Sequence, residues 1–446
     1  YNNMQFRFLL TGLAFLAACS LPPSTYTSQV NQWAEFEIGF LSPPKEVSVA
    51  TDDSFEALFQ EARFKNQELL ASWQKWRATI ELIPQAAGLP DPKLQAGIFL
   101  SSLETKSGSA NSRLSLQQAF PWPGTLNCAT RVASAKAEAA RQDYLSKELQ
   151  LRAKMRKLCA EHFWLTSSLN STKAHLDILT QMETVVRKRW EEGVAEHGSL
   201  IKLQMELAIL EEKAAAIHDQ QQPLLAEINS LLNRSPLNPL NWPKDALLLP
   251  TDLDSNQLMR NLEFNNPQMR GWDCLEQAHQ MKVHLAELGM FPNFTIGIDW
   301  TGIESNGIGN DSGKDAFALA VGLELPLQQR SRKSRVRQSR SMLASIRAQR
   351  IQTLSTLLSE LETEFFKLRD AERRFELHQN GLVPKGQQAL DSTLIAYQSG
   401  KASFLDYLDT QRTLLDSELA VLRATADRSI TLAEIAALSG TQLSER

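Results

Sequence analysis

Two long stretches without proline or glycine constrain the fold of this chain more than any other feature. The first runs from Leu126 to about Glu192, the second runs from about Ser331 to Gln379, and helical composition resumes from Val383 to Ser399. Both stretches are rich in residues that favour helix. A helix of about 65 residues would be roughly 100 Å long at about 1.5 Å per residue. Such a helix cannot fold back into a compact globule, so we expect it to pack lengthwise against partner helices.

The apolar spacing within the second stretch suits a coiled coil, in which apolar side chains recur along one face of the helix. The residues that carry this spacing are Leu354, Leu357, Leu358, Leu361, Phe365 and Leu368. These segments alone are equally compatible with a structural coiled-coil rod.

The chain also contains an internal repeat. The segment around Asn66 matches the segment around Asn266, an offset of 266 − 66 = 200 residues. Each copy shows a helix, a pair of short strands, a very long helix, a break at a glycine and another helix. The stretch from Ser235 to Pro243 is rich in Pro and Asn and is typical of a linker. We therefore predict repeats at 51–234 and 251–440, a linker at 235–250 and a tail at 441–446.

Each copy contains two segments in which apolar residues alternate with polar or small ones, as in a strand between two different environments. The apolar positions are Leu94, Ala96, Ile98 and Leu100, then Leu114 and Leu116, then Phe294, Ile296, Ile298 and Trp300, and last Phe317, Leu319, Val321, Leu323 and Leu325. Alternation alone fits a half-buried sheet or a lipid-facing wall. The length of about nine or ten residues, with Trp122 and Trp300 near the ends, favours the lipid-facing wall.

The number of strands per chain then predicts an oligomer. After Cys19 the sequence contains no apolar run of about eighteen residues, the length of a membrane-spanning helix. Four strands are too few to close a β-barrel, and open edges cannot exist in lipid. Three chains would supply 3 × 4 = 12 strands, so we expect a homotrimer.

The N-terminal residues predict a signal peptide at 1–18. Met4 is a plausible start, Arg7 is positively charged, and Phe8 to Ala18 is apolar. Leu16-Ala17-Ala18-Cys19 resembles a bacterial lipobox, which implies that Cys19 carries diacylglycerol and palmitate and that residues 19–50 form a lipid-anchored linker. The alternative is an ordinary buried cysteine behind a conventional signal.

Several function classes lack support in the sequence. The formal net charge is −4, so no basic field favours nucleic acid. Cys128, Cys159 and Cys274 form no CxxC motif, and no His stands at metal-site spacing. No nucleophile–base pairing or phosphate-binding loop appears, so we predict neither an enzyme nor a metal or cofactor site beyond the lipid on Cys19.

Three motifs resemble the TolC-like outer-membrane factor family, over nearly all of residues 50–440. They are Leu89 to Leu94 before the first strand, Gln118 to Gly124 after the second, and Tyr397 to Gln411. The first two are most similar to lipoprotein members of heavy-metal efflux systems. The resemblance implies a mainly α fold in which a trimeric twelve-stranded β-barrel continues into a long α-helical barrel. It also implies sorting to the outer membrane, since Ser20 follows Cys19.

The function implied is a passive exit duct that extends from the bacterial outer membrane into the periplasm. Its partners would be a periplasmic adaptor and an inner-membrane pump of the resistance-nodulation-division (RND) type, exporting heavy-metal cations or drugs. The alternatives are the outer-membrane component of a type I protein secretion system and a structural coiled-coil lipoprotein without a pore.

Two sets of glycines and prolines are candidate site residues. Pro121, Pro123 and Gly124 suit a strand-to-helix junction, because proline fixes φ for a first helical turn and glycine permits a sharp change of direction. Gly193 and Gly400, 400 − 193 = 207 residues apart, occupy matching places where each long helix should reverse. The family resemblance implies that these two turns dock the adaptor; ordinary helix C-caps are the alternative.

The resemblance also implies a periplasmic gate at Asp406, Asp409 and Tyr397. The two aspartates lie on one helix face, and three chains would place 3 × 2 = 6 carboxylates around the pore, a ring that attracts cations. A solvated outer face is the alternative. The family's gate arginine is replaced here by Ala402, beside Lys401.

Two further groups of residues, four histidines and a basic run, suit ordinary structural roles. His162, His175, His197 and His218 lack ligand spacing and are expected to be ordinary helix residues. The basic run from Arg330 to Arg340 would lie near lipid headgroups or the duct wall, or would simply be a solvated helix start.

Overall fold

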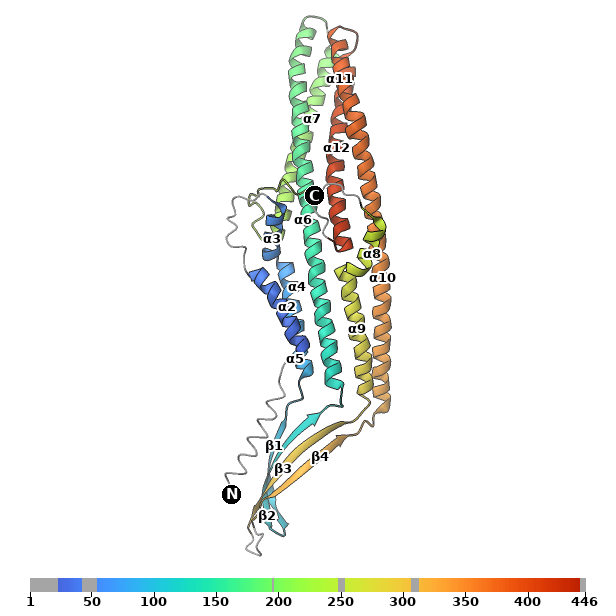
Figure 1. Cartoon of the computed structure of the whole chain (residues 1–446). Coiled ribbons are helices and arrows are strands. Elements are labelled where there is room, and N and C mark those ends of the chain that lie inside the picture. The colour runs from blue at the N-terminus through green and yellow to red at the C-terminus, as the bar shows by residue number, and fades with distance from the viewer. Residues whose placement is uncertain (1–22, 42–53, 195, 248–252, 306–312, 442–446) are drawn as a thin grey trace. The chain divides into compact units, whose positions relative to one another are not determined.

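The computed structural model describes residues 23–41, 54–194, 196–247, 253–305 and 313–441. The mainly helical fold with a small antiparallel sheet is confirmed (Figure 1). The strands are β1 Lys93–Thr105, β2 Gly108–Phe120, β3 Asn293–Glu304 and β4 Ala316–Glu324. The helices of the first half are α2 Ser24–Leu41, α3 Phe55–Lys65, α4 Gln67–Ile80, α5 Leu82–Ala87, α6 Thr125–Glu191 and α7 His197–Leu231. Those of the second half are α8 Ser255–Asn265, α9 Pro267–Leu288, α10 Gln329–Glu376, the π-helix η1 Leu377–Leu382, α11 Val383–Gln398 and α12 Phe404–Ser439.

Several predictions from the N-terminal sequence fall on residues that the structure does not describe. The signal peptide at 1–18 and the lipidated Cys19 lie outside the described residues. Within the segment 19–50, predicted to be a linker, residues 24–41 form α2. Across the described part of the chain, no helix combines the length and the apolar character needed to cross a membrane.

The chain divides into two compact units, and each draws segments from both halves of the sequence. Unit 1 comprises 1–42, 74–142 and 271–351, and unit 2 comprises 43–73, 143–270 and 352–446. The predicted linker at 235–250, described up to residue 247, contains turns but neither helix nor strand. The compact units therefore do not coincide with the predicted repeats, which stay a prediction.

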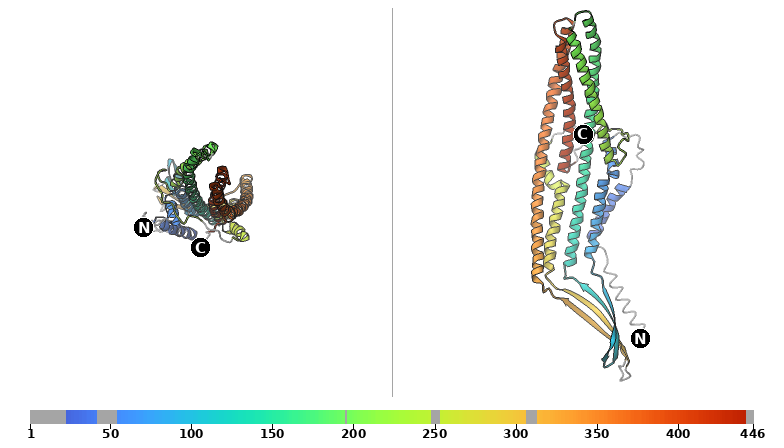
Figure 2. Two further views of the ribbon diagram at one scale, coloured as in Figure 1. Left: turned by 90° about the horizontal axis from the view of Figure 1, so that it is seen from above. Right: turned by 180° about the vertical axis from the view of Figure 1, so that it is seen from behind.

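The sheet belongs to unit 1 and has the strand order β1-β2-β3-β4, with every neighbouring pair antiparallel (Figure 2). The register aligns apolar residues of all four strands on one face, in the rows Leu94, Leu116, Ile298, Leu319 and Ala96, Leu114, Trp300, Phe317. The opposite face carries polar and small residues, such as the row Gln95, Ser115, Asp299, Ala318. The strand alternation predicted from the sequence thus becomes a sheet with two chemically different faces.

Unit 2 contains the helix turns. α6 reverses into α7 and α11 reverses into α12, and both turns lie at the same end of the unit (Figures 1 and 2). Along α10 the predicted apolar positions Leu357, Leu361 and Phe365 are buried, in a cluster with residues of α8 and α12. The interruption of helical composition between Gln379 and Val383 does not end the helix, because the π-helix η1 connects α10 directly to α11. A single π-type turn accommodates a local irregularity without breaking the helix.

Asn66 and Asn266, the matching points of the sequence repeat, make equivalent contacts. The Asn66 Oδ1 accepts from the Leu69 N–H at 2.9 Å, and its Nδ2 donates to the Leu231 carbonyl at 3.2 Å. The Asn266 Oδ1 accepts from the Gln268 N–H at 2.7 Å, and its Nδ2 donates to the Leu438 carbonyl at 2.8 Å. Each buried amide therefore caps the start of one helix and satisfies a carbonyl at the end of another.

We expect Asn266→Ala to destabilise the protein by about 1–3 kcal/mol, because it leaves a buried carbonyl and helix N–H groups without a partner. The measurement is chemical denaturation of the detergent-solubilised protein. Asn266→Asp keeps the capping oxygen but cannot donate, so it should fall between Asn266→Ala and the wild type. Asn256→Ala, at an exposed position of α8, is the matched control. Equal stabilities of Asn266→Ala and Asn256→Ala would contradict the capping role.

Candidate functional site

The two helix turns of unit 2 have the same backbone geometry. Gly193 has φ +75° and Gly400 has φ +73°, in the left-handed region that favours glycine. The Val194 N–H donates to the Arg189 carbonyl at 2.7 Å, and the Lys401 N–H donates to the Ala396 carbonyl at 2.8 Å. Both glycines thus end a helix in the same way. Apart from each glycine and its chain neighbours, no atom of the described residues lies within 4 Å of a Cβ built on Gly193 or Gly400, so the backbone conformation and not a lack of space requires glycine. Docking at these turns stays a prediction.

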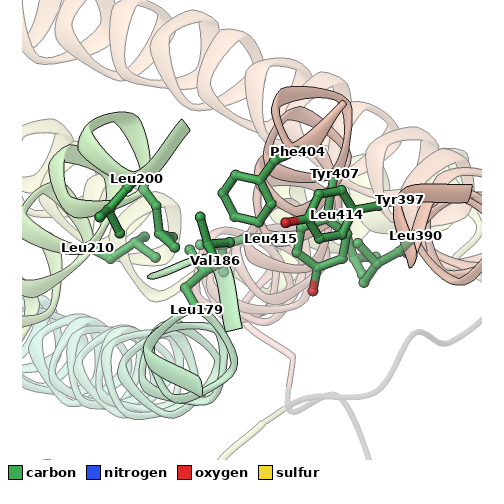
Figure 3. Packing of buried hydrophobic residues seen from close by; sticks show 11 residues of the cluster. Leu179, Val186, Leu200, Leu210, Leu390, Tyr397, Phe404, Tyr407, Leu414 and Leu415 are labelled. Atoms are coloured by element: carbon green, nitrogen blue, oxygen red, sulfur yellow. The ribbon is translucent and has the colours of Figure 1, made fainter. Parts of the chain in front are cut away.

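An apolar cluster from four helices holds the turn end together (Figure 3). It contains Leu179 and Val186 of α6, Leu200, Leu203 and Leu210 of α7, Leu390 and Tyr397 of α11, and Phe404, Tyr407, Leu414 and Leu415 of α12. The Phe404 ring lies 5.3 Å from the Tyr397 ring and 5.9 Å from the Tyr407 ring, between centroids. Aromatic pairs at these separations add to the stability gained by burial.

Tyr397, a predicted gate residue, is held by its ring and its carbonyl. The Arg189 guanidinium of α6 lies 4.6 Å from the ring centroid, and its Nη1 donates to the Tyr397 carbonyl at 3.3 Å. This cation–π contact joins α6 to α11. The Tyr397 hydroxyl is buried and has no hydrogen-bond partner among the described residues, so within one chain the hydroxyl is not the group that links the helices.

Asp406 and Asp409, the other predicted gate residues, are both exposed but differ in their local role. Asp406 completes a capping box at the start of α12, where its Oδ2 accepts from the Ser403 N–H at 3.0 Å and from the Ser403 hydroxyl at 2.9 Å. The Ser403 Oγ accepts in turn from the Asp406 N–H at 3.2 Å. For the Asp409 side chain we find no such contact in the described region of the turn. The pKa of Arg412 is raised mainly by the hydrogen bond and the charge of Glu206, and the charge of Asp409 adds a smaller contribution.

A buried polar group between α6 and α12 was not identified from the sequence. His175 of α6, expected to be an ordinary helix residue, lies with its Nε2 3.1 Å from Glu418 Oε2 and its Nδ1 2.8 Å from Gln411 Nε2, both on α12. The hydrogen bond from His175 lowers the pKa of Glu418, and Ser171 also donates to this carboxylate, at 2.7 Å. The partners are more than two hundred residues apart in sequence, so no local signal could have shown this contact.

The predicted strand–helix junction lies in unit 1, between β2 and α6. Gly124 has φ +88°, and α6 begins at the next residue. The Trp122 ring stacks on Phe291 with centroids 4.9 Å apart, and the Trp122 N–H donates to Asn293 Oδ1 at 3.3 Å. Pro121 lines a cavity beside this junction. Pro121, Pro123 and Gly124 thus lie between the end of β2 and the start of α6, where the strand–helix junction was predicted.

The described residues contain no group of three or more His, Cys, Asp and Glu side chains that could hold a metal ion. Among the described residues, Cys128, Cys159 and Cys274 form no disulfide. Burial raises the pKa of the Cys159 thiol to about 12, as expected for a cysteine that serves in packing.

Comparisons with known proteins give a consistent picture. Residues 258–441 match the family model described as outer membrane efflux protein. The chain is 23% identical over 361 residues to the toxin and drug export protein A of Aggregatibacter actinomycetemcomitans, covering 78% of this chain and 76% of that protein. It is 22% identical over 457 residues to the pyoverdine export outer membrane protein OpmQ of Pseudomonas aeruginosa, covering 94% and 93%. Its fold is similar to that of the outer-membrane channel OprN, with a TM-score of 0.74, 17% identity and coverage of 87% and 90%.

Proposed function

We propose that this chain, whose residues 258–441 match the family model described as outer membrane efflux protein, is the outer-membrane exit duct of a tripartite efflux system. The duct is a passive homotrimeric channel without a catalytic centre, and it is gated at its periplasmic end. A periplasmic adaptor and an inner-membrane pump of the RND type complete the system.

The observation that carries this proposal is the difference between the two faces of the sheet. On the apolar face Leu319 is 73% exposed and Ile298 is 57% exposed. On the opposite face Arg113 and Asp299 form an ion pair at 3.1 Å. An outward apolar face and an inward polar face are what a strand needs between lipid and a water-filled lumen.

Oligomer formation follows from the edges of the sheet. β1 and β4 each have a strand neighbour on one side only within the described sheet, and an unpaired edge is unfavourable in lipid because backbone N–H and C=O groups lack partners. Three copies joined edge to edge give 3 × 4 = 12 strands and close a β-barrel. The equivalent contacts of Asn66 and Asn266 support the further proposal that each chain is a tandem repeat.

The turn end of unit 2 supplies the gate and the docking surface in this proposal. Gly193 and Gly400 end their helices in equivalent turns, which present equivalent surfaces to the adaptor. Asp406 and Asp409 are exposed on the first turns of α12, and a threefold axis would bring 3 × 2 = 6 carboxylates together. Like charges at close range attract cations and oppose further negative charge.

The cargo is set by the pump, and the relatives indicate its range. One relative is named for toxin and drug export and the other for pyoverdine export. Of the two cargo classes expected from the sequence, drugs and heavy-metal cations, only drugs appear in these names. Export of a protein toxin through a type I secretion system is the second candidate function, favoured by the name of the first relative.

The purified protein should migrate as a trimer and conduct ions in planar lipid bilayers, because the proposed barrel encloses a continuous aqueous lumen. The Leu319→Lys and Ile298→Lys variants should insert poorly, since a lysine on the lipid face costs about 2–4 kcal/mol at mid-membrane depth. Gln95→Lys, at an exposed position on the opposite face of the same sheet, is the control and should insert normally. A monomer that inserts without conductance would favour the structural coiled-coil alternative.

Asp406→Asn combined with Asp409→Asn should reduce channel block by multivalent cations such as hexamminecobalt(III), because the carboxylate ring loses its charge. Asparagine is used because it keeps an acceptor for the Ser403 cap. Asp219→Asn, at an exposed position of α7, removes one charge outside the turn and should leave the block unchanged. If the double variant is blocked as strongly as the wild type, both carboxylates lie outside the pore.

We also propose that Cys19 is lipid-anchored, on the resemblance of Leu16 to Cys19 to a lipobox. Cells that express the full chain should incorporate labelled palmitate into the wild type and not into Cys19→Ser. Cys159→Ser, at a buried position, controls for non-specific labelling. Equal labelling of the Cys19→Ser variant would exclude this anchor.

A further inference from the structure

The first turns of α10 carry positive charge that is not neutralised within the chain. Residues 329–359 contain eight arginines and lysines and no aspartate or glutamate. Three of the arginines pair with acidic residues of α9: Arg340 with Glu287 at 2.8 Å, Arg347 with Glu276 at 2.8 Å and Arg350 with Asp273 at 2.6 Å. Within the part of the chain that is described, no ion pair involves the remaining five, which are Arg330, Arg332, Lys333, Arg335 and Arg337. The unpaired charge is therefore concentrated in the first three turns of the helix.

Two of these arginines line a cavity of about 780 Å³ at the end of the sheet, within the range of about 300–1,000 Å³ typical of small-molecule sites. Arg332 and Arg335 come from α10, and Ser331 and Gln328 add polar groups beside them. Arg332 Nη1 donates to the Gly289 carbonyl, which fixes the guanidinium at the cavity and leaves its other donors available. A pair of guanidinium groups is well suited to a phosphate group, which each can contact through two N–H donors.

The cavity also contains one acidic side chain. Glu324 lines it, and its Oε2 accepts a hydrogen bond from Asn293 Nδ2 at 2.9 Å. Because two arginines face a single carboxylate, the lining keeps a net positive charge. The unpaired cations Arg330, which precedes Arg332, and Lys333, which lies between Arg332 and Arg335, are on the same helix turns and increase that charge.

Apolar side chains at the same cavity are exposed. Leu327 is 83% exposed, Leu325 is 60% exposed and Phe291 is 47% exposed, and all three line the cavity. They are next to the apolar end of the sheet, where Leu323 of β4 pairs with Phe294 of β3. Leu325 and Leu327 come shortly after Leu323 in the chain, and Phe291 comes shortly before Phe294. A water-soluble anion would use the arginines and leave this apolar surface in contact with water, whereas a lipid would cover it.

We propose that this cavity binds the headgroup of an anionic phospholipid in the inner leaflet of the outer membrane. Arg332 and Arg335 hold the phosphate, and Phe291, Leu325 and Leu327 contact the glycerol and the first methylene groups of the acyl chains. The order along unit 1, from apolar strand residues through the stacked Trp122 and Phe291 to the arginines, matches the order of hydrocarbon, interface and headgroup in a bilayer. This inference rests on the proposed membrane location of the sheet.

The test measures the thermal stability of the full chain, purified in detergent, against the concentration of added dioctanoyl lipids. Dioctanoyl phosphatidylglycerol should raise the melting temperature in a saturable way, because a ligand that binds the folded state stabilises it. Phosphatidylethanolamine and phosphatidylcholine of the same chain length, and inorganic phosphate, should have much weaker effects. Arg332→Gln with Arg335→Gln should raise the half-effective phosphatidylglycerol concentration by about tenfold or more.

Arg369→Gln with Arg373→Gln is the matched control, since it removes the same charge from exposed positions further along α10 and should leave the lipid response unchanged. If the Arg332 and Arg335 double variant does not fold, Arg332→Lys with Arg335→Lys keeps the charge and should bind more weakly while still preferring phosphatidylglycerol.

Three results would overturn the proposal. Equal responses to all three lipids would show that the anionic headgroup is not recognised, and a full response to inorganic phosphate alone would identify a free anion as the ligand. An unchanged lipid response in the glutamine double variant, together with a loss of trimer mass, would identify the cavity as a contact between copies. Bilayer conductance, measured on the same preparations, distinguishes these failures from a failure of the proposed channel function.

Discussion

The pairing of β2 with β3 is the interaction on which the organisation of unit 1 depends. It joins two hairpins that are separated in sequence by all of α6 to α9, through an antiparallel register that runs from Ser109 and Glu304 to Phe120 and Phe294. The register of this pairing aligns the apolar rows of one hairpin with those of the other. A shift of one residue would turn every side chain of one hairpin to the opposite face of the sheet. The same pairing brings Trp122 against Phe291 at the start of α6.

In unit 2 the geometry of the turns depends on polar side chains as much as on the apolar cluster. Gly400 ends α11, and the reciprocal cap between Ser403 and Asp406 fixes the residue at which α12 begins. Across the helices, Arg412 of α12 forms an ion pair with the buried Glu206 of α7. The hydrogen bonds from Ser403 to the Asp406 carboxylate therefore do two things: they fix the start of α12, and they hold this carboxylate in place there. In the proposed gate, a charge oriented in advance by these bonds would reduce the entropy lost on binding a cation.

Much of this fold could be predicted from the sequence because the strongest signals are local. Absence of proline and glycine predicts α6 and α10, since helix propensity acts residue by residue. Alternation with period two predicts which strand residues share a face, and the glycines at 193 and 400 predict turns because few other residues adopt a positive φ. The interruption of helical composition between Gln379 and Val383, which contains Gly381, shows the limit of that argument, because the chain stays helical there. A glycine lowers helix propensity by only about 1 kcal/mol, and packing of α11 against α12 is enough to keep the chain helical through η1.

The rest could not be predicted, because it depends on which distant side chains meet. His175 has no ligand-like spacing in the sequence, yet its two ring nitrogens lie beside Glu418 and Gln411 of α12. The basic run at the start of α10 was noted in the sequence, but sequence spacing could not separate Arg332 and Arg335, which line a cavity, from Arg340, which pairs with Glu287 of α9. The distinction depends on how α9 packs against α10, which the pattern of neither helix sets alone. Charge in a sequence therefore indicates where binding can occur, and only the pairing of each charge shows what is left to bind.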